Sequence, residues 1–370
     1  MAIKLSILDQ TPIYEGETAA EAFQRTVRLA QKAEELGYTR FWVSEHHDSG
    51  VVAGSSPEVL IAHLLAKTDR IRLGSGGVML QHYSPYKVAE NFNVLASLGP
   101  GRIDLGIGRA PGGLPRSTQA LQQGGADPVS LTDKITELRQ YIHNRLEEDH
   151  PLYGLRANPV TDHPADLYVL GTSAASAEIA AELGLPYVFS LFINGDPDTA
   201  IQALQAYRSN FNDTFGTKPQ AILGVSVIAA ESDEEAQRLA GDHKLVKIHL
   251  ESGRTITVSN LEHAQEFGSQ TKEKFTIEVK EPQVTKGSIE KVKKELLELQ
   301  RATGVDEFIV ITAVEDFPRR LRSFELLKEA FNDTSDDDEI EENVLAGNPS
   351  SGRGEADDGS GKHRIVEPVI

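Results

Sequence analysis

The sequence predicts an α/β protein whose first 331 residues form a closed (β/α)8 TIM barrel with insertions. Short apolar segments alternate with amphipathic helical patterns along this part of the chain, which is typical of parallel strands joined by helices. Eight such pairs can be counted, and a chain of 370 residues with 39% apolar content can bury the core of a barrel. A doubly wound open sheet is the alternative that pattern alone leaves open.

The expected strands are short apolar runs, several of which end in small or polar residues. In chain order they cover residues 3–8, 41–44, 71–75, 103–107, 167–170, 187–191, 222–230 and 308–312. The expected helices carry apolar residues at helical spacing, and the first of them is stopped by Gly37. These helices cover residues 19–36, 57–67, 87–98, 131–145, 174–183, 200–211, 232 to about 250, 288–303 and 317–331.

Three stretches do not fit the alternation. Residues 110–130 are rich in Gly, Pro and Gln and are expected to form an inserted loop, and residues 251–285 are expected to be irregular. Residues 332–370 carry 11 acidic against 3 basic residues and few large apolar ones. Such a segment cannot offset its ordering entropy by burial, so we expect a disordered acidic tail beyond a barrel domain of residues 1–331. Docking of the apolar end at 365–370 on a neighbour is the alternative.

Composition excludes several classes of protein. The chain has no cysteine, which rules out a disulfide framework, a thiolate nucleophile and a cysteine-ligated metal. A net charge of −19 disfavours nucleic acid and anionic membrane as partners. The longest apolar runs are too short to span a membrane, and the N-terminus does not resemble a signal peptide. A cytoplasmic protein is therefore expected.

Polar and small residues gather where the expected strands end. In a barrel these ends meet at one rim, which is where barrel enzymes carry their chemistry. The residues placed there are Asp9, Gln10, Glu45, His46, His47, Gly76, Gly77, Gly108, Arg109, Gly171, Thr172, Ser173 and Asn194.

An anion site is expected on this rim. Thr172, Ser173 and Ala174 join a strand to the start of a helix, where free backbone N–H groups commonly bind phosphate. Arg109 follows another strand and supplies a permanent positive charge. A phosphate-bearing ligand held between Arg109 and Ser173, with its reactive end near His46, is a coherent hypothesis.

Each of these residues also has a purely structural interpretation. His46 could be a hydrogen-bonded structural histidine, and Arg109 could close a salt bridge with Asp104 or Glu45. His47 is expected to be a structural partner, because adjacent residues on a strand point in opposite directions.

Two other kinds of site are disfavoured. A metal site at residues 46–48 is not expected, because consecutive residues chelate poorly and no third ligand of matching spacing is evident. The glycines at 106, 108 and 112 resemble a dinucleotide-binding loop, but prolines rather than a helix follow them, so this kind of site is disfavoured.

His243 and His249 are expected on the solvated face of a charged helix.

Four segments together resemble a known family. They read WVSEHHD, IRLGSGGVMLQHYSPYKVAENFNVLASLGPGRIDLGIGRAPG, LYVLGTSAASAEIAAELGLPYVFS and VDEFIVITAVEDFPRRLRSFELLKEAF. The resemblance is to the luciferase-like flavin-dependent monooxygenases, which include bacterial luciferase, and it spans residues 3–331. The resemblance implies a (β/α)8 barrel. It also implies reduced FMN, supplied by a separate flavin reductase or by NAD(P)H, and O2 activated at the flavin. Some relatives use the deazaflavin F420 instead.

The resemblance also implies roles for particular residues. His46 matches the catalytic histidine beside the flavin, where its unperturbed pKa suits acid–base work. Arg109 matches a flavin phosphate contact. The turn at Thr172, Ser173 and Ala174 matches the phosphate-binding turn, which has Glu and Ser at the first two positions in luciferase. Gly76-Gly77 matches a bulge that holds a non-proline cis peptide in luciferase.

Two departures from luciferase are evident. Gly108 stands where luciferase has a cysteine near the flavin, so protection of a flavin peroxide cannot depend on that side chain. A second phosphate-binding arginine has no clear counterpart around residues 127–132.

The leading hypothesis is a monooxygenase that forms a flavin C4a-peroxide from reduced FMN and O2 and oxygenates a small organic substrate, expected as a homodimer. The first alternative is F420- or NAD(P)H-linked hydride transfer without oxygen chemistry. The second is a flavin-binding protein without turnover, against which the retained Glu45, His46 and His47 argue. The sequence does not name the substrate, whose pocket depends on the loops at 110–130 and 251–285.

Overall fold

A closed barrel of eight parallel strands forms the body of the protein. The computed structural model describes residues 3–122, 129–214, 216–258 and 260–332. The barrel strands are β1 (Lys4–Asp9), β2 (Arg40–Val43), β3 (Arg72–Met79), β4 (Ile103–Gly108), β5 (Asp166–Gly171), β6 (Tyr187–Ser190), β7 (Ala221–Ala229) and β12 (Glu307–Ile311). They pair in this order, and β12 closes the barrel on β1. The predicted (β/α)8 fold is therefore confirmed.

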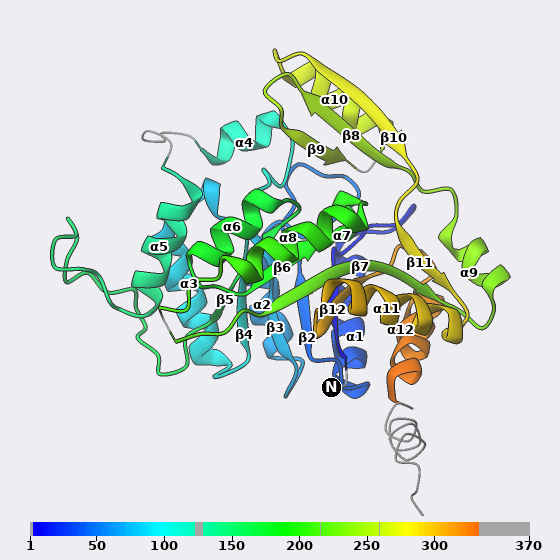
Figure 1. Cartoon of the computed structure of the whole chain (residues 1–370), viewed down its shortest axis with the longest axis horizontal. Coiled ribbons are helices and arrows are strands. Elements are labelled where there is room, and N and C mark those ends of the chain that lie inside the picture. Colours follow the sequence, from blue (N-terminus) through cyan, green and yellow to red (C-terminus); the bar gives the residue numbers. More distant parts are fainter. Residues whose placement is uncertain (1–2, 123–128, 215, 259, 333–370) are drawn as a thin grey trace, which may run out of the picture. The chain divides into compact units, whose positions relative to one another are not determined.

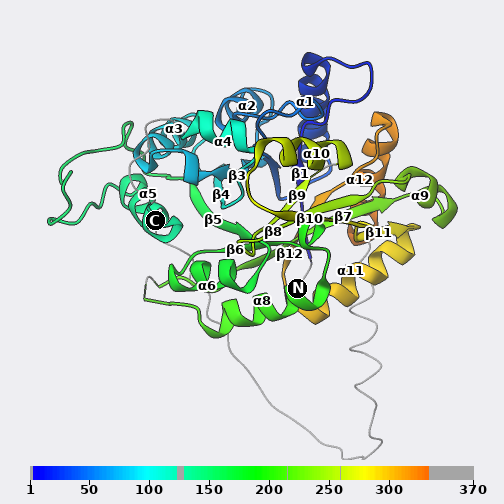
Figure 2. The same ribbon diagram turned by 90° about the horizontal axis from the view of Figure 1, so that it is seen from above.

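Helices surround the barrel, as Figure 2 shows from above. They are α1 (Ala19–Glu35), α2 (Pro57–Leu65), α3 (Pro85–Leu98), α5 (Leu131–Ile142), α6 (Ala174–Glu182), α8 (Pro197–Ser209), α9 (Asp233–Ala240), α11 (Ile289–Thr303) and α12 (Phe317–Asn332). Shorter helical elements are η1 (Leu80–His82), α4 (Pro115–Leu121) and α7 (Leu191–Asn194). Within the described ranges, no helix has the length and apolarity needed to cross a membrane.

Local sequence accounts for several helix ends. α1 begins at a capping box, in which the Thr18 hydroxyl accepts from the Glu21 N–H and the Glu21 carboxylate accepts from the Thr18 N–H. α11 stops at Gly304, which adopts the left-handed conformation. Caps of this kind lie in the sequence itself, which is why these helices could be predicted to within a few residues.

The helix predicted from residue 232 to about 250 is wrong in its second half. α9 ends at Ala240, and the following Gly241 has a φ of 55°, where glycine is favoured. Residues Leu245–Leu250 form strand β8, in which Val246, Ile248 and Leu250 are buried on one face. This alternation has the period of a strand. His249 therefore lies on a strand, where its ring contacts Glu278.

The stretch expected to be irregular contains a small antiparallel sheet. β8 pairs with β9 (Thr255–Val258) and with β10 (Phe275–Lys280), and α10 (Leu261–Gln270) joins these two. A further short strand, β11 (Val284–Gly287), returns the chain to β7. The predicted loop at 110–130 likewise contains a helix, α4.

This small module, residues 245–280, lies beside α4 over the barrel mouth (Figure 1). Its core is Val246, Ile248, Leu250, Ala264 and Phe267, and Leu114 from the connection after β4 packs into it. The Lys247 ammonium donates to the Asn194 carbonyl at 2.7 Å, after β6. Both contacts are with segments that follow barrel strands, which places the module at the carboxyl ends of the strands.

The opposite end of the barrel is closed by a buried ionic network. Arg40 donates to Glu307 at 2.7 Å and to Asp104 at 2.9 Å, and the Trp42 indole also donates to Asp104. An apolar layer lies above it, made of Leu8, Trp42, Tyr168, Val188, Ile222 and Ile309. Chemistry in this barrel is thereby confined to the carboxyl ends of the strands.

The predicted tail at 332–370 and the region around residue 127 fall almost wholly outside the described residues. Disorder of the tail stays a prediction from composition.

Candidate active site

Four neighbouring strands carry the predicted site residues at their carboxyl ends. β2, β3, β4 and β5 are consecutive in the sheet, and they lead into His46, Gly76–Gly77, Arg109 and the Thr172–Ala174 turn respectively. Adjacent strands lie about 4.8 Å apart. The expectation that these residues share one rim is therefore confirmed.

His46 belongs to the inward face of β2 and its extension. Side chains alternate along a strand, and Trp42 points into the barrel core. The Ser44 hydroxyl lies 3.0 Å from His46 Nδ1, and the His46 N–H donates to the Gly54 carbonyl at 2.7 Å. Hydrogen bonds therefore fix both the imidazole ring and the backbone of His46.

The protonation state of His46 differs from the sequence expectation. The pKa of His46 is lowered to about 4, mainly by burial and to a smaller extent by the neighbouring His47, while Glu45 partly opposes both. The imidazole is consequently neutral at pH 7. It can accept a proton or a hydrogen bond, but it is not an acid at that pH.

Glu45 and His47 lie on the opposite side of the chain from His46. His47 Nε2 is 2.7 Å from Glu45 Oε1, which also accepts from the Tyr83 hydroxyl at 2.8 Å. Glu45 Oε2 accepts from the Met79 N–H at 3.0 Å. The prediction that His47 is a structural partner agrees with these contacts.

The Gly76–Gly77 segment has the geometry predicted for it. Its peptide bond is cis, and the register of β3 against β4 shifts between Ser75 and Val78, as in a bulge. A Cβ on Gly77 would lie 2.8 Å from the Gly106 carbonyl oxygen. Only glycine lets the two backbones approach this closely.

The absence of a side chain at Gly108 leaves room for Met79. A Cβ on Gly108 would lie 3.2 Å from the Met79 sulfur atom. Gly106, two residues earlier, is packed even more tightly, because a Cβ there would lie 2.9 Å from the Leu170 side chain and closer still to the Ser75 carbonyl. The wall between β3 and β4 is therefore lined by backbone and by one methionine.

Arg109 is exposed on the rim. The salt bridges considered for it from sequence are not formed, since Asp104 pairs with Arg40 and Arg72, and Glu45 binds its own partners. Among the described residues, no carboxylate lies within ion-pair distance of the Arg109 guanidinium. Within that part of the chain its charge is unpaired.

The turn between β5 and α6 presents the start of a helix to the same rim. The Ser173 hydroxyl caps α6 by accepting from the Ser176 N–H. The Thr172 carbonyl accepts from the Asn194 side chain at 2.9 Å, which fixes the turn. Within the described chain, the N–H groups of Ala174 and Ala175 have no acceptor, so the predicted anion site retains two free donors.

Not every strand-end residue faces the mouth. Asp9 is buried outside the barrel wall, where it accepts from Arg320 at 2.8 Å and from the Thr26 hydroxyl at 2.5 Å. Asp9 lies at the carboxyl end of β1, as predicted, but its side chain does not face the mouth. It lies on the outward face of β1 and anchors α1 and α12 to the strand.

Sequence reasoning missed two residues behind the site. Tyr83 reaches Glu45 from the segment after β3, and Lys134 on α5 donates to the carbonyls of Leu80, Gln81 and Tyr83. Neither residue follows a strand directly, and nothing in the local pattern distinguishes them. Only long-range packing brings them together.

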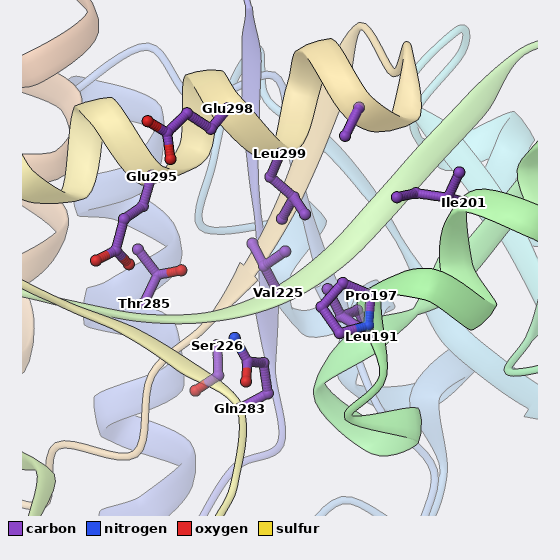
Figure 3. A pocket seen from close by; sticks show the side chains of 11 residues that line it. Leu191, Pro197, Ile201, Val225, Ser226, Gln283, Thr285, Glu295, Glu298 and Leu299 are labelled. Atoms are coloured by element: carbon purple, nitrogen blue, oxygen red, sulfur yellow. The ribbon is translucent and has the colours of Figure 1, made fainter.

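A separate pocket of about 450 Å³ lies on the flank of the barrel. Figure 3 shows it between β7, α8 and α11, with Val225, Ile201 and Leu299 on one side and the carboxylates of Glu295 and Glu298 on another. None of the predicted site residues lines this pocket. We therefore assign the candidate active site to the rim and not to this flank.

Comparison with known proteins places the chain in a family. A family model described as luciferase-like monooxygenase matches residues 3–307. An N-acetyl-S-alkylcysteine monooxygenase from Bacillus subtilis (strain 168) is 42% identical over 329 residues, which are 89% of this chain and 98% of that protein. A luciferase-like monooxygenase from Escherichia coli (strain K12) is 37% identical and covers 88% of this chain and 96% of its own.

Solved structures give the same result. The crystal structure of apo-MsnO8 is 36% identical, with a TM-score of 0.72, and the match covers 90% of this chain and 98% of that one. At 19% identity, the fold also matches the oxygenating constituent of 3,6-diketocamphane monooxygenase from Pseudomonas putida in complex with FMN, with a TM-score of 0.66 and coverage of 89% of this chain and 97% of that one.

Proposed function

This chain belongs to the luciferase-like monooxygenase family and is an enzyme of that family, and we propose that it uses reduced FMN and O2 to oxygenate a small organic substrate. The observation that carries the proposal is the row of four strand ends. It supplies a neutral imidazole, a glycine bulge, and a guanidinium and two N–H groups that have no partner among the described residues, all on one rim.

The donor set suits a phosphate-bearing flavin. Arg109 and the N–H groups of Ala174 and Ala175 offer positive charge and donors to a phosphate, with Thr172 and Ser173 shaping the turn. Gly76 and Gly77 have no side chains, and Leu8 and the Gly106 backbone fill the positions that their Cβ atoms would take. A flat ring would therefore rest against the backbone of this bulge. Arg109, Thr172, Ser173 and Ala174 would thus hold the phosphate end, and the glycine pair the ring.

When bound, reduced FMN would supply the two electrons with which one oxygen atom of O2 enters the substrate and the other leaves as water. His46 would accept a hydrogen bond or a proton at its free ring nitrogen, because its other nitrogen faces Ser44. The module at 245–280 and the connection at 110–121 would limit access of water to the mouth.

The name of the 42% identical relative supplies a first substrate to test. N-acetyl-S-alkylcysteines combine a thioether with a carboxylate and an amide, and they are small enough for a barrel mouth. We further propose that a separate flavin reductase delivers reduced FMN and that the enzyme acts as a homodimer, which sedimentation would test.

The proposal is tested first by binding and then by turnover. Fluorescence titrations with oxidised FMN, reduced FMN and F420 should rank reduced FMN first. With reduced FMN, oxygen uptake should depend on substrate, and His46→Ala should lower turnover by about 10²–10⁴-fold while leaving flavin affinity nearly unchanged.

Two results would contradict the proposal. Full activity of His46→Ala would remove the histidine from the reaction. Rapid substrate conversion without oxygen, or a strong preference for F420, would favour the hydride-transfer alternative.

A further inference from the structure

We propose that Glu45 is a positioning residue, which holds His46 and the Gly76–Gly77 bulge in a fixed relation to each other. The inference rests on the function proposed above, because these two elements are the ones expected to face the flavin ring. Among the described residues, the Glu45 carboxylate bonds to His47, to the Met79 N–H and to Tyr83, and not to His46.

Glu45 bonds to the neighbours of both elements. His47, which contacts Glu45 Oε1 at 2.7 Å, directly follows His46, and Met79, whose N–H contacts Oε2 at 3.0 Å, is two residues beyond Gly77. Any movement of the carboxylate therefore displaces the end of β2 and the end of β3 together.

The carboxylate is well suited to this task because it is buried. Glu45 is 1% exposed and accepts from three donors, of which the Tyr83 hydroxyl at 2.8 Å is the third. Charge-assisted hydrogen bonds in a buried setting are short and directional, so they fix geometry more firmly than exposed ones.

The segment that carries Tyr83 is itself fixed by Lys134. The Lys134 ammonium is surrounded by the carbonyls of Leu80, Gln81 and Tyr83, at 3.2, 3.0 and 3.1 Å. This arrangement ties the turn after β3 to α5. The backbone of Tyr83 is thereby fixed where its hydroxyl reaches Glu45.

The test compares Glu45→Gln with a matched carboxylate at the other end of the barrel. Glu34 also anchors backbone, since it accepts from the N–H groups of Asp69, Arg70 and Ile71 just before β3. Glu34→Gln therefore controls for loss of a backbone-anchoring charge. Tyr83→Phe removes one of the three bonds while keeping the Glu45 charge.

Hydrogen exchange of the ligand-free protein is the first measurement, because it does not depend on the proposed function. In Glu45→Gln, peptides covering residues 44–48 and 76–80 should exchange about tenfold faster, with a smaller change in Tyr83→Phe. Glu34→Gln should leave both peptides unchanged and accelerate only those around residues 69–71.

Flavin binding and turnover form the second measurement. In Glu45→Gln, affinities for FMN and riboflavin should fall by the same factor, about three- to tenfold, since the ring and not the phosphate is affected. The kcat should fall about tenfold or more with KM within threefold, whereas Glu34→Gln should keep kcat within twofold at 25 °C.

The outcomes separate the two proposals. Unchanged exchange at residues 44–48 and 76–80 in Glu45→Gln would overturn the positioning role, whatever the flavin results. Faster exchange there with no flavin binding by the wild-type protein would uphold the coupling within the fold and instead refute the proposed function. Equal losses of kcat in Glu45→Gln and Glu34→Gln would also overturn the inference.

Discussion

Replacing Arg109 with Ala tests the expected phosphate site most directly. The guanidinium is exposed on the rim, and no described carboxylate pairs with it, so its removal leaves no buried charge behind. Any loss of affinity therefore reports an interaction with the ligand. A charge-assisted hydrogen bond contributes about 1.5–3 kcal/mol. Because Arg109 is exposed, solvent screening favours the lower end of this range, about 1.5 kcal/mol, or roughly tenfold in Kd.

The assay is a pair of fluorescence titrations with FMN and with riboflavin, which lacks the phosphate. Arg109→Ala should weaken FMN about tenfold and riboflavin less than twofold, and the FMN effect should shrink at high salt as the charge is screened. Arg116→Ala is the matched control, since Arg116 is an exposed arginine on the same connection and its removal changes net charge equally. Equal losses for FMN and riboflavin, or equal effects of the two substitutions, would refute the assignment.

Three further predictions follow from the same geometry. Gly77→Ala should destabilise the protein by about 1–3 kcal/mol in chemical denaturation, since its Cβ meets backbone, while Gly76→Ala should cost less because its nearest neighbour is the end of a leucine side chain. In a pH profile, kcat/KM should fall on the acid side near pH 4 rather than near pH 6.5. The wild type should also lose stability relative to His46→Gln as the pH falls from 6.5 to 4, because His46 takes up its proton in the unfolded chain at a higher pH than in the folded one. Lys134→Met should lower the free energy of unfolding by about 1.5–3 kcal/mol, since three carbonyls lose a charged donor; an unchanged denaturation midpoint would show that water replaces it.

The sequence by itself determined the alternation of strands and helices and the residues at the strand ends, whereas the pairing of β12 with β1 decided that the sheet is closed. Strand and helix periods, capping residues and glycine stops are local signals, so the alternation of elements and the residues at the strand ends could be predicted without coordinates. The positions of His46, Arg109 and the 172–174 turn followed from those strand ends. The Gly76–Gly77 bulge followed from resemblance.

Tertiary structure decided which way the strand-end residues face and how they are charged. Asp9 and Glu45 both end strands, yet each is drawn outward by partners far away in the sequence, Arg320 and Tyr83. Likewise, residues 245–250 could have continued a helix, but pairing with residues 275–280 makes them a strand. The pKa of His46 depends on the burial that the closed barrel imposes. Contacts between residues distant in the sequence fix these properties, and no local pattern contains them.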